Sequence, residues 1–147
     1  MDKIILHSAQ LQCNTHRAFK MFTDNQLLES WLVNVAEVES FVGGKYELFW
    51  EPSDRENNST LGCKVTAIEV DRFLAFEWRS PKQFKHFANL ADPLTHVVVF
   101  FIPSHQGTEV YLLHSGWRNS VEWEEARQWQ DQAWRGAFQE LGKLVNG

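Results

Sequence analysis

The stretch VEWEEARQWQDQAWRGAFQELGKLV, residues 121–145, decides the fold. Asn119 or Ser120 can cap its start. Glu122, Glu124 and Glu125 lie near that start, where their negative charges interact favourably with the positive end of the helix dipole. At 1.5 Å per residue, a helix of this length spans roughly 37 Å, enough to cross a small domain. The apolar stripe that predicts this long helix comprises Trp123, Ala126, Gln130, Ala133, Trp134, Ala137, Phe138, Leu141, Leu144 and Val145.

The residues before this helix are dominated by strand-like segments. Several of them alternate apolar and polar side chains, which is typical of strands with one face on a core. The Gly43-Gly44 pair separates two apolar segments and favours a hairpin, because glycine accepts positive φ. The clearest predicted strands are KYELFWE (45–51), LGCKVTAIEV (61–70), FLAFEWRS (73–80), THVVVFFIP (95–103) and EVYLLHSGW (109–117).

The opening of the chain predicts one strand followed by two short helices. Residues 3–13 loosely alternate as a strand, and residues 15–23 have helical spacing. The Thr23-Asp24-Asn25 break then caps a second helix whose stripe reaches Trp31. The whole order, β-α-α-β…β-α, predicts one α+β domain over residues 1–147, with a curved antiparallel sheet of about six or seven strands around the long terminal helix.

One segment does not suit a simple hairpin connection. PKQFKHFANLADPL, residues 81–94, carries Phe84, Phe87 and Leu90 at three-residue spacing. Long connections in compact domains are often lids or binding loops. We expect a short helix or a structured loop over the rim of the sheet.

Composition and charge narrow the class of protein. The formal net charge of −5 and a pI of about 5.6 disfavour nucleic-acid binding. The basic residues are scattered, no apolar run approaches bilayer length, and the first residues lack a signal-peptide pattern, so no membrane association is expected. Cys13 and Cys63 are expected to be reduced core thiols in a cytoplasmic protein.

The ordered set of motifs resembles the SRPBCC, or START-like, helix-grip superfamily. Within it, the chain is similar to the branch that contains the C-terminal domain of the activator of heat-shock protein 90 ATPase. The resemblance covers nearly the whole chain. Its motifs are AFKMFTDNQLLESWL (18–32), Gly43-Gly44 followed by KYELFW, LGCKVTAIEVDRFLAFEWR (61–79), GTEVYLLHSGW (107–117) and WRGAFQELGKLV (134–145).

The resemblance implies a helix-grip fold and three possible functions. The first is binding of a hydrophobic small molecule, lipid-like or polyketide-like, between the sheet and the helix. The second is a protein-interaction module that acts as a chaperone cofactor, and the third is a cyclase-type enzyme. The segment 81–94 is longer than this branch usually shows, and the sequence has no counterpart of the eukaryotic activator's separate N-terminal domain, which argues against chaperone activation. Either a monomer or a homodimer is compatible with the sequence.

The abundance of aromatic residues, including 7 tryptophans and 11 phenylalanines, favours a cavity lined by rings. The alternative is that the same rings simply pack as core. Trp129 is expected to lie near the lining residues that the long helix supplies. The predicted lining residues are Trp31, Tyr46, Leu48, Trp50, Cys63, Val65, Phe76, Trp78, His96, Val98, His114, Trp134 and Phe138.

Polar residues give no clear catalytic pattern. The six histidines form no metal-binding motif, so no metal, cofactor or catalytic residue is predicted. His96 and His114 are either hydrogen-bonded residues at the sheet ends or polar anchors that face the interior. Glu47, Glu77 and Arg79 are expected on the solvated sheet face, although Glu47 and Arg79 would orient a polar ligand group if they entered the cavity.

Overall fold

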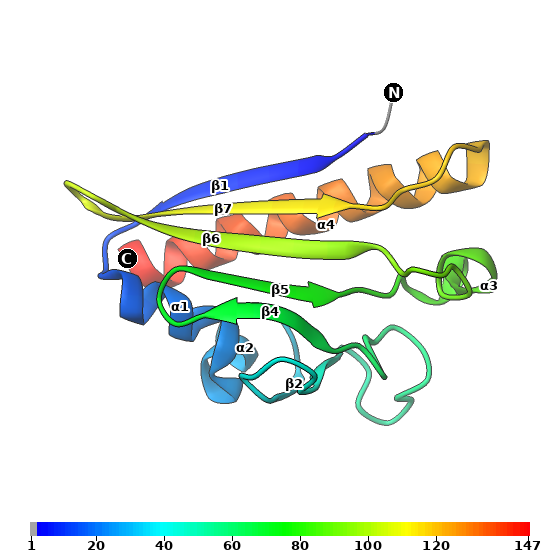
Figure 1. The fold of residues 1–147 in the computed structure, drawn as a ribbon, viewed down its shortest axis with the longest axis horizontal. Helices are drawn as coiled ribbons and strands as arrows, with labels where there is room; N and C mark the ends of the chain where they lie inside the picture. Colours follow the sequence, from blue (N-terminus) through cyan, green and yellow to red (C-terminus); the bar gives the residue numbers. More distant parts are fainter. Residues whose placement is uncertain (1–2) are drawn as a thin grey trace.

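The computed structural model describes residues 3–147 and has the predicted α+β architecture (Figure 1). In chain order the elements are β1 (Ile5–Leu11), α1 (Thr15–Thr23), α2 (Asn25–Trp31), β2 (Val35–Val38), β3 (Tyr46–Phe49), β4 (Val65–Glu69), β5 (Phe73–Glu77), the 3₁₀ turn η1 (Lys82–Phe84), α3 (Lys85–Ala88), β6 (His96–Ser104), β7 (Gly107–Ser115) and α4 (Val121–Asn146).

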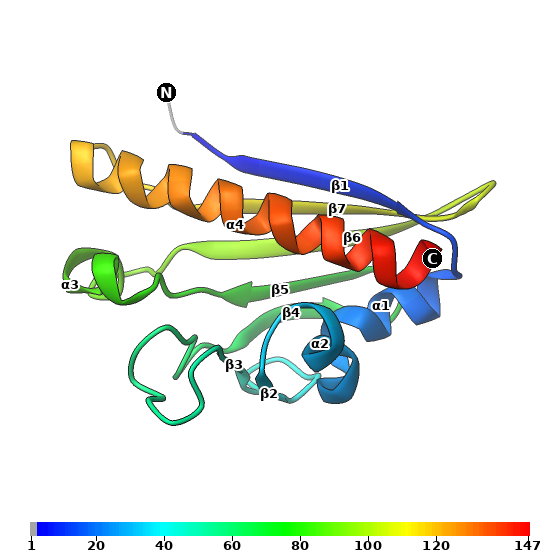
Figure 2. The same cartoon turned by 180° about the vertical axis from the view of Figure 1, so that it is seen from behind.

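The strands form two antiparallel sheets. The larger sheet has five strands in the order β1-β7-β6-β5-β4, and β2 pairs with β3 in the smaller one. The two sheets meet where Tyr46 N–H donates to Cys63 O and Val65 N–H donates to Gly44 O, each over 2.8–2.9 Å. Helix α4 lies lengthwise across one face of the larger sheet, while α1 and α2 lie near the C-terminal end of α4 (Figure 2). This arrangement is the predicted helix-grip fold.

Side-chain caps define the helix starts. The Asn14 side chain accepts from Arg17 N–H over 2.8 Å, and Asp24 ends α1 and then caps α2 by accepting from Leu27 N–H. Ser120 accepts from Trp123 N–H and starts α4. These oxygens satisfy N–H groups that have no partner within the helix, which explains why the polar residues at 24 and 120 marked the helix starts correctly.

A β-bulge in β4 changes which side chains enter the core. The pairing of β4 with β5 shifts between Val65 and Ala67, so Val65 pairs with Phe76 whereas Ala67 pairs with Ala75. The extra residue reverses the alternation along the strand. Ala67 consequently lies on the sheet face that turns away from α4, not beside Cys63 and Val65 as the sequence pattern suggested.

The core lies between α4 and the larger sheet. Trp134, Phe138 and Leu141 of α4 are buried there, as the helical stripe predicted. Strand β6 contributes Val97, Val99 and Phe101, all of which are at most 3% exposed. No helix within residues 3–147 combines the length and hydrophobicity needed to cross a membrane.

Candidate ligand-binding site

A pocket of about 550 Å³ opens between the middle of α4 and the ends of β3 and β5. Five of the seven tryptophans line it, from four different parts of the chain. Its lining comprises Trp31, Leu32, Trp50, Glu51, Asn58, Ser59, Trp78, Arg79, Pro81, Gln83, Trp129, Gln130, Gln132, Ala133, Trp134, Gly136, Ala137 and Glu140.

Helix α4 forms an apolar wall with room beside it. Ala133 and Ala137 lie one helical turn apart on the face that lines the pocket, and Gly136 lies between them. Trp129 and Trp134 flank this stretch of small residues. Because these side chains are small, they leave space beside α4 that larger side chains would fill. Helix α4 therefore contributes two of the rings and also the recess between them.

The indole N–H groups of four lining tryptophans are engaged within the protein. Trp31 donates to Met21 O over 2.8 Å and Trp50 donates to Leu32 O over 2.9 Å. Trp78 donates to Gln130 Oε1 and Trp134 donates to His114 Nδ1, each over 3.1 Å. The internal acceptors hold these rings in place, so the rings offer the pocket apolar surface and not a polar edge.

His114 lies beneath this ring cluster and is fully buried. Because its Nδ1 accepts from Trp134, Nε2 carries the proton and donates to Thr95 Oγ1 over 3.0 Å. Burial lowers the pKa of His114 to about 3, and the nearby His96 adds to this effect. His114 is therefore a neutral, structural member of the site that orients Trp134.

The wall opposite α4 is polar. Asn58, Ser59, Arg79 and Gln83 contribute to it. The Arg79 Nη1–H donates to Asn89 O over 3.2 Å, whereas its Nε is buried without a hydrogen-bond partner. It is the single such side-chain atom within the described residues 3–147. The pocket thus has an aromatic wall on one side and, on the other, a polar wall that contains a guanidinium group.

Two carboxylates lie at the exposed rim of the pocket. Glu51 Oε1 accepts from Asn58 Nδ2 over 2.8 Å, and Glu140 Oε1 lies 3.5 Å from Lys143 Nζ. Both glutamates are exposed to solvent. Their charges are therefore partnered and screened more than a charge inside the pocket would be.

Residues 81–94 form a flap beside the pocket, which confirms the prediction of a short helix in this segment. The flap contacts α4 through two edge-to-face ring pairs: Phe84 with Trp129 at 6.2 Å and Phe87 with Trp123 at 5.2 Å between centroids. At its start, Lys82 N–H donates to Asn58 Oδ1 over 2.9 Å. These contacts connect the flap to both walls of the pocket.

The structure separates the thirteen predicted lining residues into three groups. Trp31, Trp50, Trp78 and Trp134 line the pocket. The second group is buried in the core instead, because its members pack against one another; for example, the Tyr46 ring stacks on Phe76 at 3.7 Å. This group comprises Tyr46, Leu48, Cys63, Val65, Phe76, His114 and Phe138.

His96 and Val98 lie on the opposite face of the sheet, so the expectation that they face the interior is wrong. Val97 pairs with His114 across β6 and β7, and it is the odd-numbered residues of β6 that enter the core. His96 instead contacts Thr66 Oγ1 through Nε2 over 2.6 Å. Strand β6 is apolar throughout, so alternation could not identify its inner face.

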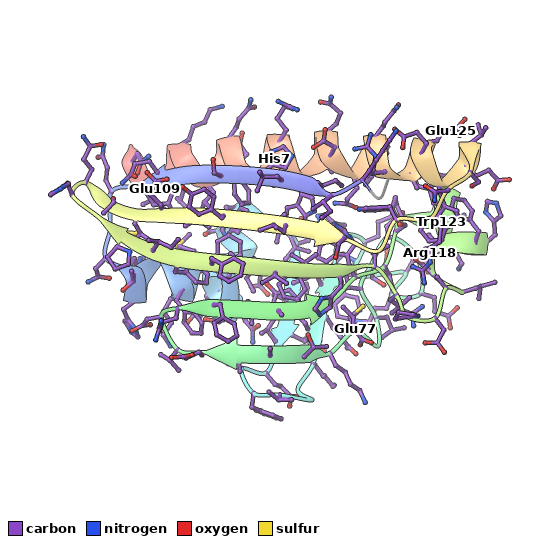
Figure 3. The ribbon with its side chains drawn as sticks, turned by 45° about the horizontal axis from the view of Figure 1, so that its top comes forward. His7, Glu77, Glu109, Arg118, Trp123 and Glu125 are labelled. Carbon is purple, nitrogen blue, oxygen red and sulfur yellow. The ribbon has the colours of Figure 1, made fainter. Side chains whose placement is uncertain are left out.

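Glu47 also departs from its predicted place on a solvated face. It is 8% exposed, and its Oε2 accepts from Gly62 N–H over 2.9 Å. Glu77 remains on the outer side, where Oε1 accepts from Lys64 N–H (Figure 3). Arg79 is thus the one member of the predicted polar trio that lines the pocket.

The pocket includes residues that sequence reasoning overlooked. Asn58 comes from a loop and Gln83 from the single 3₁₀ turn η1, and in such short irregular segments periodicity carries no information about direction. Ala133 and Ala137 had a usable signal, since small residues one turn apart within an aromatic stripe leave space beside a helix. In residues 3–147, no group of three or more His, Cys, Asp or Glu is arranged to hold a metal ion.

Solved structures share this fold over nearly their full length. Protein MLL2253 from Mesorhizobium loti has 19% identity and a TM-score of 0.77, covering 98% of this chain and 97% of its own. The Aha1 dimer from Colwellia psychrerythraea has 14% identity and a TM-score of 0.74, covering 97% and 96%. SSP2350 from Staphylococcus saprophyticus has 16% identity and a TM-score of 0.71, covering 95% and 89%. At these identities the likeness establishes the fold alone.

The family assignment comes from the sequence. No functionally curated protein gives a significant match to the chain. The model of one family, described as "Activator of Hsp90 ATPase homolog 1-like protein", matches residues 12–146, which run from the end of β1 to the end of α4. The predicted membership is thereby confirmed: the chain belongs to the Activator of Hsp90 ATPase homolog 1-like family, on the helix-grip fold.

Proposed function

We propose that the protein binds a small molecule with a flat apolar body in the pocket beside α4. The observation that carries this proposal is the gathering of Trp31, Trp50, Trp78, Trp129 and Trp134 around one pocket of about 550 Å³. Ligand pockets commonly measure about 300–1,000 Å³ and combine apolar walls with a few polar groups. This pocket has both properties.

The energetic argument favours an aromatic or similarly flat ligand. Burying about 200 Å² of apolar ligand surface contributes about 5 kcal/mol at 25 cal/mol per Å², before the entropic cost of association. Trp50 and Trp78 already lie edge to face with 5.8 Å between centroids, and Trp78 lies 5.0 Å from Trp134. A ligand ring entering the pocket extends this cluster without displacing an indole hydrogen bond.

Calorimetric titration with naphthalene-2-carboxamide, a neutral two-ring probe, tests the proposal. We expect the unmodified protein to bind it and Ala133→Leu to bind at least about tenfold more weakly, because the larger side chain occupies the recess beside α4. Gln139→Leu adds the same side chain at an exposed position of α4 outside the pocket and should bind normally. Absence of binding, or equal binding by all three proteins, would contradict the proposal.

A second candidate function is a protein-interaction module of the chaperone-cofactor kind. The family description supports it, and so does the exposure of apolar side chains on the outer sheet face, including Leu6 at 62% and Phe100 at 39%. Phe84 and Phe87 are less available, since they pack against α4. The test is the ATP hydrolysis rate of an Hsp90 with the protein added: Phe100→Ser should abolish any stimulation if this face makes the contact.

We also propose that the protein is cytoplasmic. Its oligomeric state is tested by measuring the molecular mass in solution. Cys13 and Cys63 are both free thiols, which suits a reducing compartment. The Colwellia relative was solved as a dimer. If the outer sheet face joins two copies of this chain, light scattering will give twice the monomer mass, and Phe100→Ser will return the value to that of one chain.

A further inference from the structure

Arg79 differs from most other arginines of the chain in lacking a carboxylate partner. Arg55, Arg72, Arg127 and Arg135 each lie within 4.0 Å of an Asp or Glu oxygen. Within residues 3–147, no carboxylate oxygen lies that close to Arg79. It is also half-buried and is the one cationic side chain among the pocket's lining residues. A charge in this position is uncompensated inside a partly enclosed site.

The free part of the guanidinium group is well defined. Nη1 is occupied by Asn89 O, and Nε has no partner. Nε is buried too deeply for a ligand atom to reach it, so Nη2, for which no hydrogen-bond partner lies within residues 3–147, is the donor that a ligand in the pocket can contact. The hydrogen bond to Asn89, which belongs to the flap, fixes the group while leaving Nη2 without an acceptor.

The nearby carboxylates already have other partners. Glu47 Oε2 accepts from Gly62 N–H and Glu77 Oε1 accepts from Lys64 N–H. Burial raises the pKa of the Cys63 thiol to about 12 against the opposing influence of Arg79, so Cys63 stays neutral and supplies no counter-charge. The rim carboxylates Glu51 and Glu140 are exposed and partnered.

We propose that the ligand of this pocket is an aromatic carboxylic acid whose carboxylate binds the guanidinium group of Arg79 through Nη2. The inference rests on the proposed ligand-binding function and narrows it to one chemical class. The ring system lies against the tryptophan wall of α4, and the acid group faces the polar wall. A charge-assisted hydrogen bond to the carboxylate then selects the acid over its neutral analogues.

The test compares naphthalene-2-carboxylate with naphthalene-2-carboxamide, which have the same rings and differ in charge. We expect the unmodified protein to bind the acid at least about tenfold more tightly than the amide. Arg79→Gln should bring this ratio close to one. Arg79→Lys should retain part of the preference, because it keeps the charge and loses the fork geometry.

Arg135→Gln is the matched control, since Arg135 lies on α4 outside the pocket lining and is paired with Asp131. It should keep the full preference for the acid. Equal binding of acid and amide by the unmodified protein would overturn the inference but leave the proposed function intact. A preference for the acid that stays undiminished in both Arg79 variants would also overturn the inference and leave the proposed function intact. Failure of both probes to bind would overturn the proposed function, and the inference with it.

Discussion

The layer between α4 and the sheet is packed with rings at one end and open along its middle. Towards the C-terminal end of α4, Phe138 lies 6.2 Å from Phe22 and 6.4 Å from Trp31, while Phe101 lies 5.5 Å from Phe22. These rings pack edge to face against one another. Along the middle of α4, the rings of Trp78, Trp129 and Trp134 instead surround an opening.

The difference arises from what faces α4 in each of these two regions. Helices α1 and α2 bring Phe22 and Trp31 against the C-terminal end of α4, closing it. Farther along, α4 presents Ala133 and Ala137, and the opposing wall is made of loops and the Arg79 side chain. One amphipathic helix therefore contributes to stability at one end and to a binding pocket along its middle.

The largest expected effect lies at the filled end. Phe101→Ala should lower the free energy of unfolding by about 3–5 kcal/mol, because it removes a buried ring and leaves a cavity. Phe101 is 3% exposed and contacts Phe19 and Phe22, none of which lines the pocket. Urea unfolding measures the loss. The variant that remains folded should still bind the naphthalene probes normally, and a parallel loss of affinity would contradict the separation of the two ends.

An intermediate effect is expected under the pocket, where His114 supports Trp134. Its pKa is lowered to about 3 in the folded protein, so only the unfolded chain takes up a proton as the pH falls below about 6.5. Stability from this group is complete above that pH and is lost progressively as the pH falls towards 3. For one such group, the loss between pH 7 and pH 5 amounts to about 2 kcal/mol.

His114→Gln should reduce this pH dependence by about that amount, because glutamine does not titrate in this range. Its amide can accept from Trp134 and donate to Thr95, the two partners that His114 has now. Urea unfolding at pH 7 and pH 5 gives the comparison. The exposed His16 provides the control: His16→Gln should keep the acid-dependent loss associated with His114.

The smallest effect on stability, together with a clear effect on binding, is expected at the pocket along the middle of α4. Trp129 is 42% exposed and lines the pocket, so Trp129→Ala should cost less than about 1 kcal/mol of stability while weakening the naphthalene probes about tenfold. Trp123 is another partly exposed tryptophan of α4, lying outside the pocket beside Arg118 (Figure 3). Trp123→Ala should leave probe affinity unchanged; a matching loss there would refute a specific role for Trp129.

Sequence periodicity predicted the parts of the fold in which one face is clearly apolar. The stripe of α4, the helical spacing of residues 15–23 and the caps at Asp24 and Ser120 were sufficient to place the longer helices. Periodicity failed in β6, which is apolar on both faces, and in β4, where a bulge reverses the alternation. For the site, it identified four lining tryptophans but could not distinguish a ring beside a pocket from a ring such as Phe76, which another ring covers.

The internal hydrogen bonds of the four indoles have a consequence for redesign. Since those rings are anchored by acceptors of the fold itself, exchanging their neighbours on the loop side does not remove any of the anchors. Gln83, from η1, and the exposed Gln132 of α4 are therefore positions that can be exchanged over a fixed aromatic base, whereas Asn58, with a φ of 50° and hydrogen bonds to Glu51 and Lys82, has to be kept. A library randomised at these two sites can change ligand selectivity without removing any hydrogen bond that anchors an indole.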